Sequence, residues 1–300
     1  MKIDQMEQGH NVYTLLDETG TGIMDIYEVF PGIYLSYNDF KLRKCESTYT
    51  PGGTMFGVEH CREGKIEWDC GNGQYAYLGS GCFMPCDYSD QGGGHFEFPS
   101  CTFQGMTLGF DLPRAKEGFP KEIPVDLELL QKKITEAGTV DLSKNARSTY
   151  VLGLIYEAQH LSLIHKKLAA LDFILFLDDL RWNENHAEPL YFPRQQVLLV
   201  KKMERFLKSN LDHRYTLKEL SDRFSMPVST IRRVFPGVFG YSVTEYIKKK
   251  RIEEAMRLLR ETDRTITEIS TTLGYENPSK FSAVFKSYLK VSPQIYRSEQ

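Results

Sequence analysis

The sequence predicts an α+β protein in which a strand-rich N-terminal part leads through a helical middle part to an all-helical C-terminal part. Short runs of alternating apolar and polar residues, such as GIYLSYNDF and QYAYLG, occur up to about residue 112. Further along, apolar residues recur at spacings of three and four, and motifs that start helices follow after residue 215. Alternation is typical of strands, and the 3-4 spacing is typical of helices.

The N-terminal part, residues 1–124, predicts a small β-barrel or sandwich. Its short alternating runs are separated by Gly, Asn and Asp, which favour tight turns between strands. The interior of a small barrel is filled by side chains or holds one small ligand. All six cysteines lie in the first 101 residues at irregular spacings. This pattern favours free thiols in a reducing compartment over a disulfide framework.

The middle part, residues 125–190, predicts two helices that carry much apolar surface. The recurring apolar positions are Val151, Leu154, Ile155, Ala158, Leu161, Ile164, Leu168, Leu171, Ile174 and Leu175. This surface must pack on something. Packing against the strand-rich part alone and a seam between two copies of the chain are both compatible with the pattern.

The C-terminal part, residues 191–300, predicts a compact all-helical domain. The stretch WNENHAEPLYFPR starts no obvious element, so the boundary is expected between residues 188 and 193. Thr216, Ser242 and Thr265 each begin an S/T-x-x-E motif, which caps the first turn of a helix. Asn277-Pro278 and Ser292-Pro293 each place a capping residue before a proline at the first helical position.

Charge is distributed unevenly along the chain. The net charge is −3, yet residues 194–300 hold 21 Lys and Arg against 12 Asp and Glu, while the other residues hold 16 against 28. A basic part beside an acidic one suggests that only the C-terminal part meets a polyanion. The longest apolar run, LAALDFILFL, is broken by Asp172 and is shorter than the roughly 20 residues of a membrane-spanning helix. With a polar N-terminus, these features predict a cytoplasmic protein.

One pattern occurs twice in the basic part, at an offset of about 50 residues. TLKELSDRFSMPVSTIRRVF and TITEISTTLGYENPSKFSAVF each give a capping box, a short amphipathic helix, a turn and a second helix that ends in Phe. This is the spacing of a helix-turn-helix, whose second helix presents its polar face to the DNA major groove. Two copies in a basic domain predict binding to double-stranded DNA.

The C-terminal part resembles the DNA-binding domain of the AraC/XylS family of transcription regulators. The strings that carry the resemblance are EYIKKKRIEEAMRLL, ITEIS, LGYENPSKFSAVFK and SPQIYR. The resemblance implies two helix-turn-helix units joined by a long helix, a cupin-like ligand-sensing barrel and dimerisation helices. It also implies promoter DNA, a small-molecule effector, a second copy of the chain and RNA polymerase as partners, more often in activation than in repression. EHCREGKIEW and GQYAYLGSG are most similar to the subgroup of siderophore-responsive regulators such as the pyochelin regulator.

Candidate DNA contacts lie on the polar side of the second helix of each unit. In the first helix-turn-helix, the family pattern implies that Ser229 and Arg233 face base edges and that Arg232 faces a phosphate. An arginine can donate two hydrogen bonds to guanine, which supports this interpretation from chemistry. Surface arginines that contact only solvent are the alternative. Pro236-Gly237 stands where the family usually has lysines and is expected to end this helix abruptly.

In the second helix-turn-helix, the candidate contacts are Asn277, Ser279, Lys280 and Lys286. Lysines of this kind hold phosphates, which positions a protein without reading the base sequence. Many family members have Arg where this chain has Ala283, whose methyl group offers at most a contact to thymine. In the connecting helix, the basic run Lys248 to Arg251 is compatible with phosphate contacts or with a solvated face, and Arg251 can instead pack internally.

The sensing part offers only weak candidates for a ligand site. Six aromatic side chains could line a pocket, although packing in the core is the commoner role for each: Tyr34, Tyr37, Trp68, Tyr75, Tyr77 and Phe83. A metal or redox site built from Cys82, Cys86, His95 and Cys101 is an alternative, but its spacing matches no recognised zinc pattern. No cofactor is therefore expected.

A metal-dependent enzyme of the cupin type is the second alternative for the N-terminal part. Cupin enzymes usually hold their metal with several His and one carboxylate. Only His10, His60 and His95 occur there, with no H-x-H pair. His60-Cys61 has no evident third partner for nucleophilic catalysis. An architectural DNA binder without an effector is disfavoured by the acidic N-terminal part. The chain is therefore expected not to be an enzyme.

Overall fold

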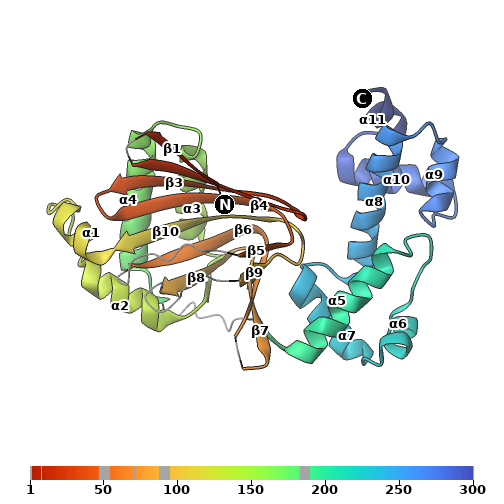
Figure 1. Cartoon of the computed structure of the whole chain (residues 1–300), viewed down its shortest axis with the longest axis horizontal. Coiled ribbons are helices and arrows are strands. Elements are labelled where there is room, and N and C mark those ends of the chain that lie inside the picture. Colours follow the sequence, from red (N-terminus) through yellow and green to blue (C-terminus); the bar gives the residue numbers. More distant parts are fainter. Residues whose placement is uncertain are drawn as a thin grey trace. The chain divides into compact units, whose positions relative to one another are not determined.

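The chain folds into two compact units, Met1–Tyr191 and Phe192–Gln300 (Figure 1). This computed structural model describes residues 2–7, 9–46, 55–70, 72–87, 95–182 and 190–299, without the side chains of residues 2–7, 45, 46, 87 and 95. The expected boundary between residues 188 and 193 falls partly outside the described residues.

The first unit is built on a mostly antiparallel sheet. Neighbouring strands follow the order β1-β2-β3-β4-β10-β6-β7, and β8 pairs with β6, β11 with β8, and β5 with β9. The strands are β1 (Lys2–Glu7), β2 (His10–Asp17), β3 (Gly20–Phe30), β4 (Ile33–Lys41), β5 (Lys44–Glu46), β6 (Met55–Asp69), β7 (Gln74–Gly79), β8 (Cys82–Asp87), β9 (His95–Glu97), β10 (Phe103–Asp111) and β11 (Val140–Asp141). A further strand, β12 (Leu190–Pro193), contains the boundary between the units.

In the described part of the chain the sheet is mostly antiparallel and does not close into a barrel, an arrangement consistent with the cupin-like domain expected from the sequence. Within that part, β1 pairs only with β2, and the ends of the strand order do not join. The long strand β6 explains the irregular edge, because its first half pairs with β8 and its second half with β7. The alternation of apolar residues predicted the strands, but closure depends on pairings between distant strands.

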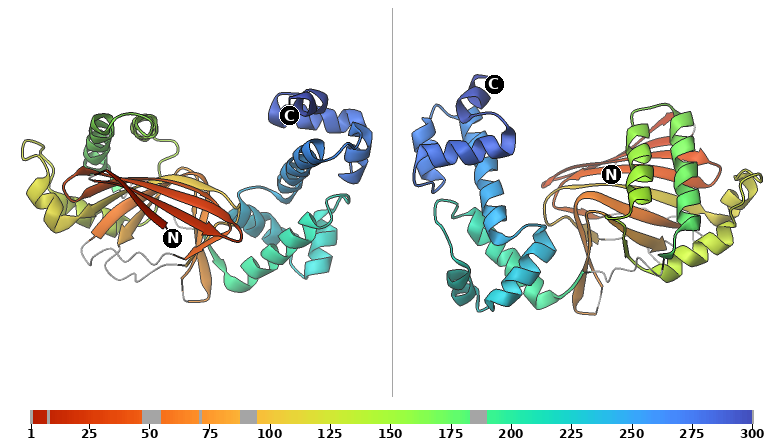
Figure 2. Two further views of the ribbon diagram at one scale, coloured as in Figure 1. Left: turned by 45° about the horizontal axis from the view of Figure 1, so that its top comes forward. Right: turned by 180° about the vertical axis from the view of Figure 1, so that it is seen from behind.

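Helices cover one face of this sheet and complete its core. They are α1 (Leu112–Gly118), α2 (Leu127–Ala137), α3 (Ala146–Ala158) and α4 (Leu163–Asp179). Figure 2 shows α3 and α4 side by side over the sheet. Val151, Ile155 and Phe173 belong to the same buried cluster as Leu35 and Phe110 of the strands. Packing on the sheet therefore buries the apolar residues on one side of the two predicted helices.

The other side of the α3–α4 hairpin carries exposed apolar side chains. Leu161 is 48% exposed, Ile164 58% and Leu168 60%, while Leu171 and Leu175 are half-buried. Four of these positions lie in α4 at spacings of four, three and four, which is the repeat of a coiled-coil seam, while Leu161 lies in the turn before α4. The hairpin thus buries one apolar face in its own unit and presents a second one.

The second unit consists of seven helices in the described residues 192–299. They are α5 (Arg194–Lys208), α6 (Leu217–Phe224), α7 (Val228–Phe239), α8 (Val243–Glu261), α9 (Ile266–Thr272), α10 (Pro278–Leu289) and α11 (Pro293–Ser298). All five helix starts predicted from capping chemistry are confirmed. Thr216, Ser242 and Thr265 form complete capping boxes, and Asn277 and Ser292 cap helices whose first turn contains a proline. The core of these helices includes Leu220, Ile231, Phe235, Ile269, Leu273, Phe281 and Phe285, which are buried, while Phe224 and Leu289 are half-buried.

The expectation that Pro236 ends its helix was wrong. Helix α7 continues through Pro236 to Phe239 and ends at Gly240, which has a left-handed backbone conformation. Its last turn is fixed by packing, because Gly237, Val238 and Phe239 are all buried. Proline removes one backbone donor from a helix, but buried side chains beyond it can hold the next turn in place.

Candidate nucleic-acid interface

Helix α7 presents the first set of predicted DNA contacts on one exposed face. Ser229, Arg232 and Arg233 lie at spacings of three and four and are all exposed, while Ile231, Val234 and Phe235 face the core. Residues three and four apart share one side of a helix. The short helix α6 packs against α7 and is stabilised by the capping box of Thr216 and Glu219. The fold therefore fixes α7 from behind and leaves its polar face open.

The two arginines of this face have different surroundings. The Nη2 of Arg233 donates to Oε1 of Gln196 at 3.1 Å, and its guanidinium lies 5.4 Å from the ring centroid of Phe192. Arg232 forms no hydrogen bond or ion pair with any described side chain. Arg233 is therefore held on α5, while Arg232 extends from the exposed face.

Helix α10 presents the second set. Asn277 is exposed, and its Oδ1 accepts a hydrogen bond from the backbone N–H of Lys280 at 2.8 Å, so it acts as the helix cap. Ser279, Ala283 and Lys286 are exposed at spacings of four and three, which places them on one face. Lys286 has no ion-pair partner among the described side chains.

Lys280 is paired within the unit. Its Nζ lies 2.9 Å from a carboxylate oxygen of Glu276, and Arg214 donates to the other oxygen of Glu276 at 2.9 Å. The hydrogen bond from Lys280, with the charges of Lys280 and Arg214, lowers the pKa of Glu276. These exposed ion pairs stabilise the fold only weakly. A phosphate could therefore compete with Glu276 for Lys280 at little cost in stability.

The basic run of α8 is divided between different environments. Lys248 is exposed, the Nζ of Lys249 donates to the hydroxyl of Tyr241 at 3.1 Å, and Lys250 pairs with Glu253 at 2.5 Å. Arg251 is buried, and its guanidinium donates to the carbonyls of Leu211 at 2.8 Å and His213 at 3.1 Å. The hypothesis that Arg251 packs internally is thus confirmed.

The six aromatic candidates of the first unit do not form one group. Tyr37, Tyr77 and Phe83 are buried, whereas Tyr34, Trp68 and Tyr75 are half-buried. The hydroxyl of Tyr37 donates to the carbonyl of Ile155 at 2.8 Å, and that of Tyr77 donates to Glu67 at 2.5 Å. Phe83 and Trp68 belong to different core clusters. These contacts give several of the candidates a packing role.

The residues of the metal alternative are only partly described. The side chain of His95 lies outside the described residues, and no group of three or more His, Cys, Asp or Glu suited to a metal occurs among the side chains that are described. Burial raises the pKa of the Cys82 thiol, which keeps it protonated. His10 pairs with Asp25 at 2.6 Å, and His60 with Tyr156 at 2.8 Å, so these two histidines have separate partners.

The described helices include none that is both long and apolar enough to cross a membrane.

Comparison with known proteins finds a family model and several similar transcription regulators. A family model described as a helix-turn-helix domain matches residues 220–299. The melibiose operon regulatory protein of Escherichia coli (strain K12) is 29% identical over 104 residues, which cover 35% of this chain and 34% of that protein. The match thus spans about a third of the length of that relative. The transcriptional activator AarP of Providencia stuartii is 28% identical over 102 residues, covering 34% of this chain and 76% of AarP.

One similar solved structure is the C-terminal domain of AraT, a response regulator from Geobacillus stearothermophilus. It is 26% identical, covers 34% of this chain and 85% of its own, and has a TM-score of 0.33.

Proposed function

Because its C-terminal unit belongs to the AraC family of transcription regulators, we propose that this protein is a ligand-responsive regulator that binds specific promoter DNA. The observation that carries the proposal is the exposed polar face of α7. The capped helix α6 packs against the opposite side of α7, and α7 lies within the matched residues 220–299. A helix that lies in the major groove needs an apolar face that packs on its own domain and a polar face that contacts the DNA.

In this proposal, α6–α7 and α9–α10 act as two helix-turn-helix units joined by α8. Each pair consists of a short capped helix, a turn and a longer helix with exposed polar residues. The buried guanidinium of Arg251 supports a fixed geometry, because it links α8 to the chain between α5 and α6. A rigid pair of units would contact two adjacent major-groove segments, about 10 base pairs apart.

The two reading helices take different roles. Ser229 and Arg233 on α7 carry a hydroxyl and a guanidinium group that can donate to base edges, and Arg232 is suited to a phosphate. On α10, Lys280 and Lys286 are suited to phosphates, and Asn277 and Ser279 flank the start of the helix. Since Ala283 stands at the centre of the exposed face of α10, we expect α7 to supply most of the sequence discrimination.

The first unit would sense the effector and join two copies of the chain. Residues 1–124 would form the sensing domain, residues 125–190 the dimerisation helices and linker, and residues 191–300 the DNA-binding domain. The exposed part of the seam on α4, Ile164 and Leu168, supports a homodimer, since coiled-coil partners bury such positions. The name of AarP as a transcriptional activator supports activation, with RNA polymerase as a further partner.

The test is selection of bound sites from genomic DNA, followed by gel retardation with a selected site and a scrambled one. We expect Arg233→Ala to weaken binding to the selected site by about 1–3 kcal/mol with little change for the scrambled site, and Arg232→Ala, which removes a phosphate contact, to weaken binding to both sites alike. Lys121→Ala, which removes an exposed charge from the first unit, is the control. If Arg233→Ala binds the selected site as Lys121→Ala does, Arg233 does not read the bases.

A further inference from the structure

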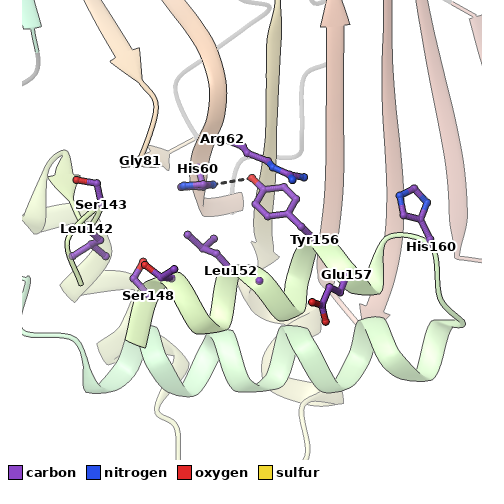
Figure 3. A pocket seen from close by; sticks show the side chains of 12 residues that line it. His60, Arg62, Gly81, Leu142, Ser143, Ser148, Leu152, Tyr156, Glu157 and His160 are labelled. Carbon is purple, nitrogen blue, oxygen red and sulfur yellow. Dashed lines mark hydrogen bonds between the residues drawn. The ribbon is translucent and has the colours of Figure 1, made fainter. Parts of the chain in front are cut away.

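A pocket of about 670 Å³, open to solvent and here called the cavity, lies in the first unit between helix α3 and strand β6, and Arg62 is among its exposed lining residues. Figure 3 shows Arg62 and His60 above it, with Tyr156, Leu152 and Ser148 contributed by α3. Small-molecule sites in proteins are of this size and combine a mostly apolar lining with a few polar groups. None of the six aromatic residues proposed from the sequence lines this cavity.

One end of the cavity is basic. The guanidinium of Arg62 lies 4.6 Å from the ring centroid of Tyr156, and it forms no ion pair with any described carboxylate. Glu157 also lines the cavity, but its carboxylate points away from Arg62 in Figure 3. A guanidinium stacked on an aromatic ring can still donate hydrogen bonds from its N–H groups. Two of these groups can donate in parallel to the two oxygens of a carboxylate.

Two neutral groups stand beside Arg62. The Nδ1 of His60 and the hydroxyl of Tyr156 are hydrogen-bonded at 2.8 Å. Burial and the nearby charge of Arg62 lower the pKa of His60 to about 4, so the imidazole is neutral at neutral pH. Burial raises the pKa of Tyr156, which keeps its hydroxyl protonated. This end of the cavity therefore offers one positive charge and neutral hydrogen-bonding groups.

An unpaired hydroxyl lies at another point of the lining. Ser148 is 1% exposed, lines the cavity, and has no hydrogen-bond partner for its Oγ among the described residues. Buried polar side-chain atoms in proteins nearly always have a partner. A polar group of a bound molecule would provide one. Leu142 and Leu152 contribute apolar side chains to the lining.

We propose that this cavity binds a small apolar carboxylic acid. Its carboxylate pairs with Arg62 beside the Tyr156 hydroxyl, its apolar body lies against Leu142 and Leu152, and a polar substituent reaches Ser148. That this acid acts as the effector rests on the proposed function. Helix α3 provides the connection, because it lines the cavity and packs against α4, which carries the exposed apolar seam.

Gly153 allows the cavity to be blocked without disturbing the fold. It lines the cavity, lies in the middle of α3, and a Cβ placed on it would meet no atom within 4 Å. Glycine is also unfavourable inside a helix, by about 1 kcal/mol relative to alanine. Gly153→Leu should therefore fold and fill part of the cavity, while Gly153→Ala gives the same backbone effect with the smallest side chain.

The experiment measures binding of 2-naphthoate and of decanoate to the full chain by calorimetry, with 2-naphthamide as an uncharged analogue of the first. We expect saturable binding of at least one acid and none of the amide. Arg62→Gln and Gly153→Leu should each weaken binding tenfold or more, whereas the exposed-charge control Lys144→Gln should not. Circular dichroism verifies that each variant is folded.

Three results would overturn the proposal: no saturable binding of either acid at millimolar concentration, equal binding of the amide, or binding unchanged in both Arg62→Gln and Gly153→Leu. Gel retardation without any acid tests the proposed function separately, so failure of the cavity and failure of DNA binding can be told apart.

Discussion

The ring of Phe192 occupies the space that a side chain at residue 237 would need. A Cβ on Gly237 would lie 2.2 Å from Cζ of Phe192, whose ring is buried. The same ring lies against the guanidinium of Arg233 on the exposed face of α7. The contact between Phe192 and Gly237 therefore fixes both the last turn of α7 and one of its candidate DNA contacts.

Gly237→Ala should destabilise the protein, because the new methyl group overlaps a buried ring. Overpacking of this kind costs about 1–3 kcal/mol, which outweighs the gain in helix propensity. The measurement is the free energy of unfolding from urea titration. Gly153→Ala is the matched control, and it should be neutral or stabilising because its methyl group meets open space. Equal effects of the two substitutions would show that Phe192 does not constrain residue 237.

The helix starts could be predicted from the sequence because capping is a local matter. Thr216 and Glu219 lie within one turn, so their types and spacing are sufficient. The end of α7 could not be predicted, since it depends on Phe192, far from Gly237 along the chain. The cavity was missed for the same reason. His60 and Tyr156 are 96 residues apart and meet only when α3 packs on the sheet.

Arg251→Met should destabilise the second unit, because it leaves the carbonyls of Leu211 and His213 without their donor. Hydrogen bonds from a charged group contribute about 1.5–3 kcal/mol each, so we expect a loss of at least about 2 kcal/mol. Arg260→Met, at an exposed position of the same helix, is the control. Urea titration measures both, and a loss no larger than that of the control would remove the structural role of Arg251.

Leu168→Glu should weaken self-association of the chain. Leu168 is 60% exposed at the centre of the seam, so a carboxylate there costs little in the monomer but would be buried in a dimer. Sedimentation equilibrium measures the dissociation constant. Leu129→Glu, at a 48% exposed leucine of α2, is the control. A wild-type chain that stays monomeric, or a dimer equally stable in both variants, would exclude the seam.

Lys286→Ala should weaken DNA binding by a similar factor for all sequences. If Lys286 holds one phosphate, its loss makes the slope of log K against log salt concentration shallower by about 0.9. The measurement is a salt titration of binding to a selected and a scrambled site, with Lys121→Ala as control. A change confined to the selected site would instead mean that Lys286 reads a base.

Acid should destabilise the first unit through His60. Its pKa is lowered to about 4 in the folded protein from 6.5, so the unfolded chain binds more protons between these values. The contribution of His60 is therefore complete above pH 6.5 and is lost as the pH falls towards 4, by about 3 kcal/mol in total. Neighbouring Glu59 acts in the opposite direction, because burial raises its pKa to about 7 and favours the folded state at acid pH.

Comparison with His60→Gln isolates the histidine, since Glu59 is present in both proteins. Unfolding free energies at pH 7, 6 and 5 should fall more steeply in the wild type than in the variant, and parallel profiles would show that His60 is protonated alike in the folded and unfolded chain.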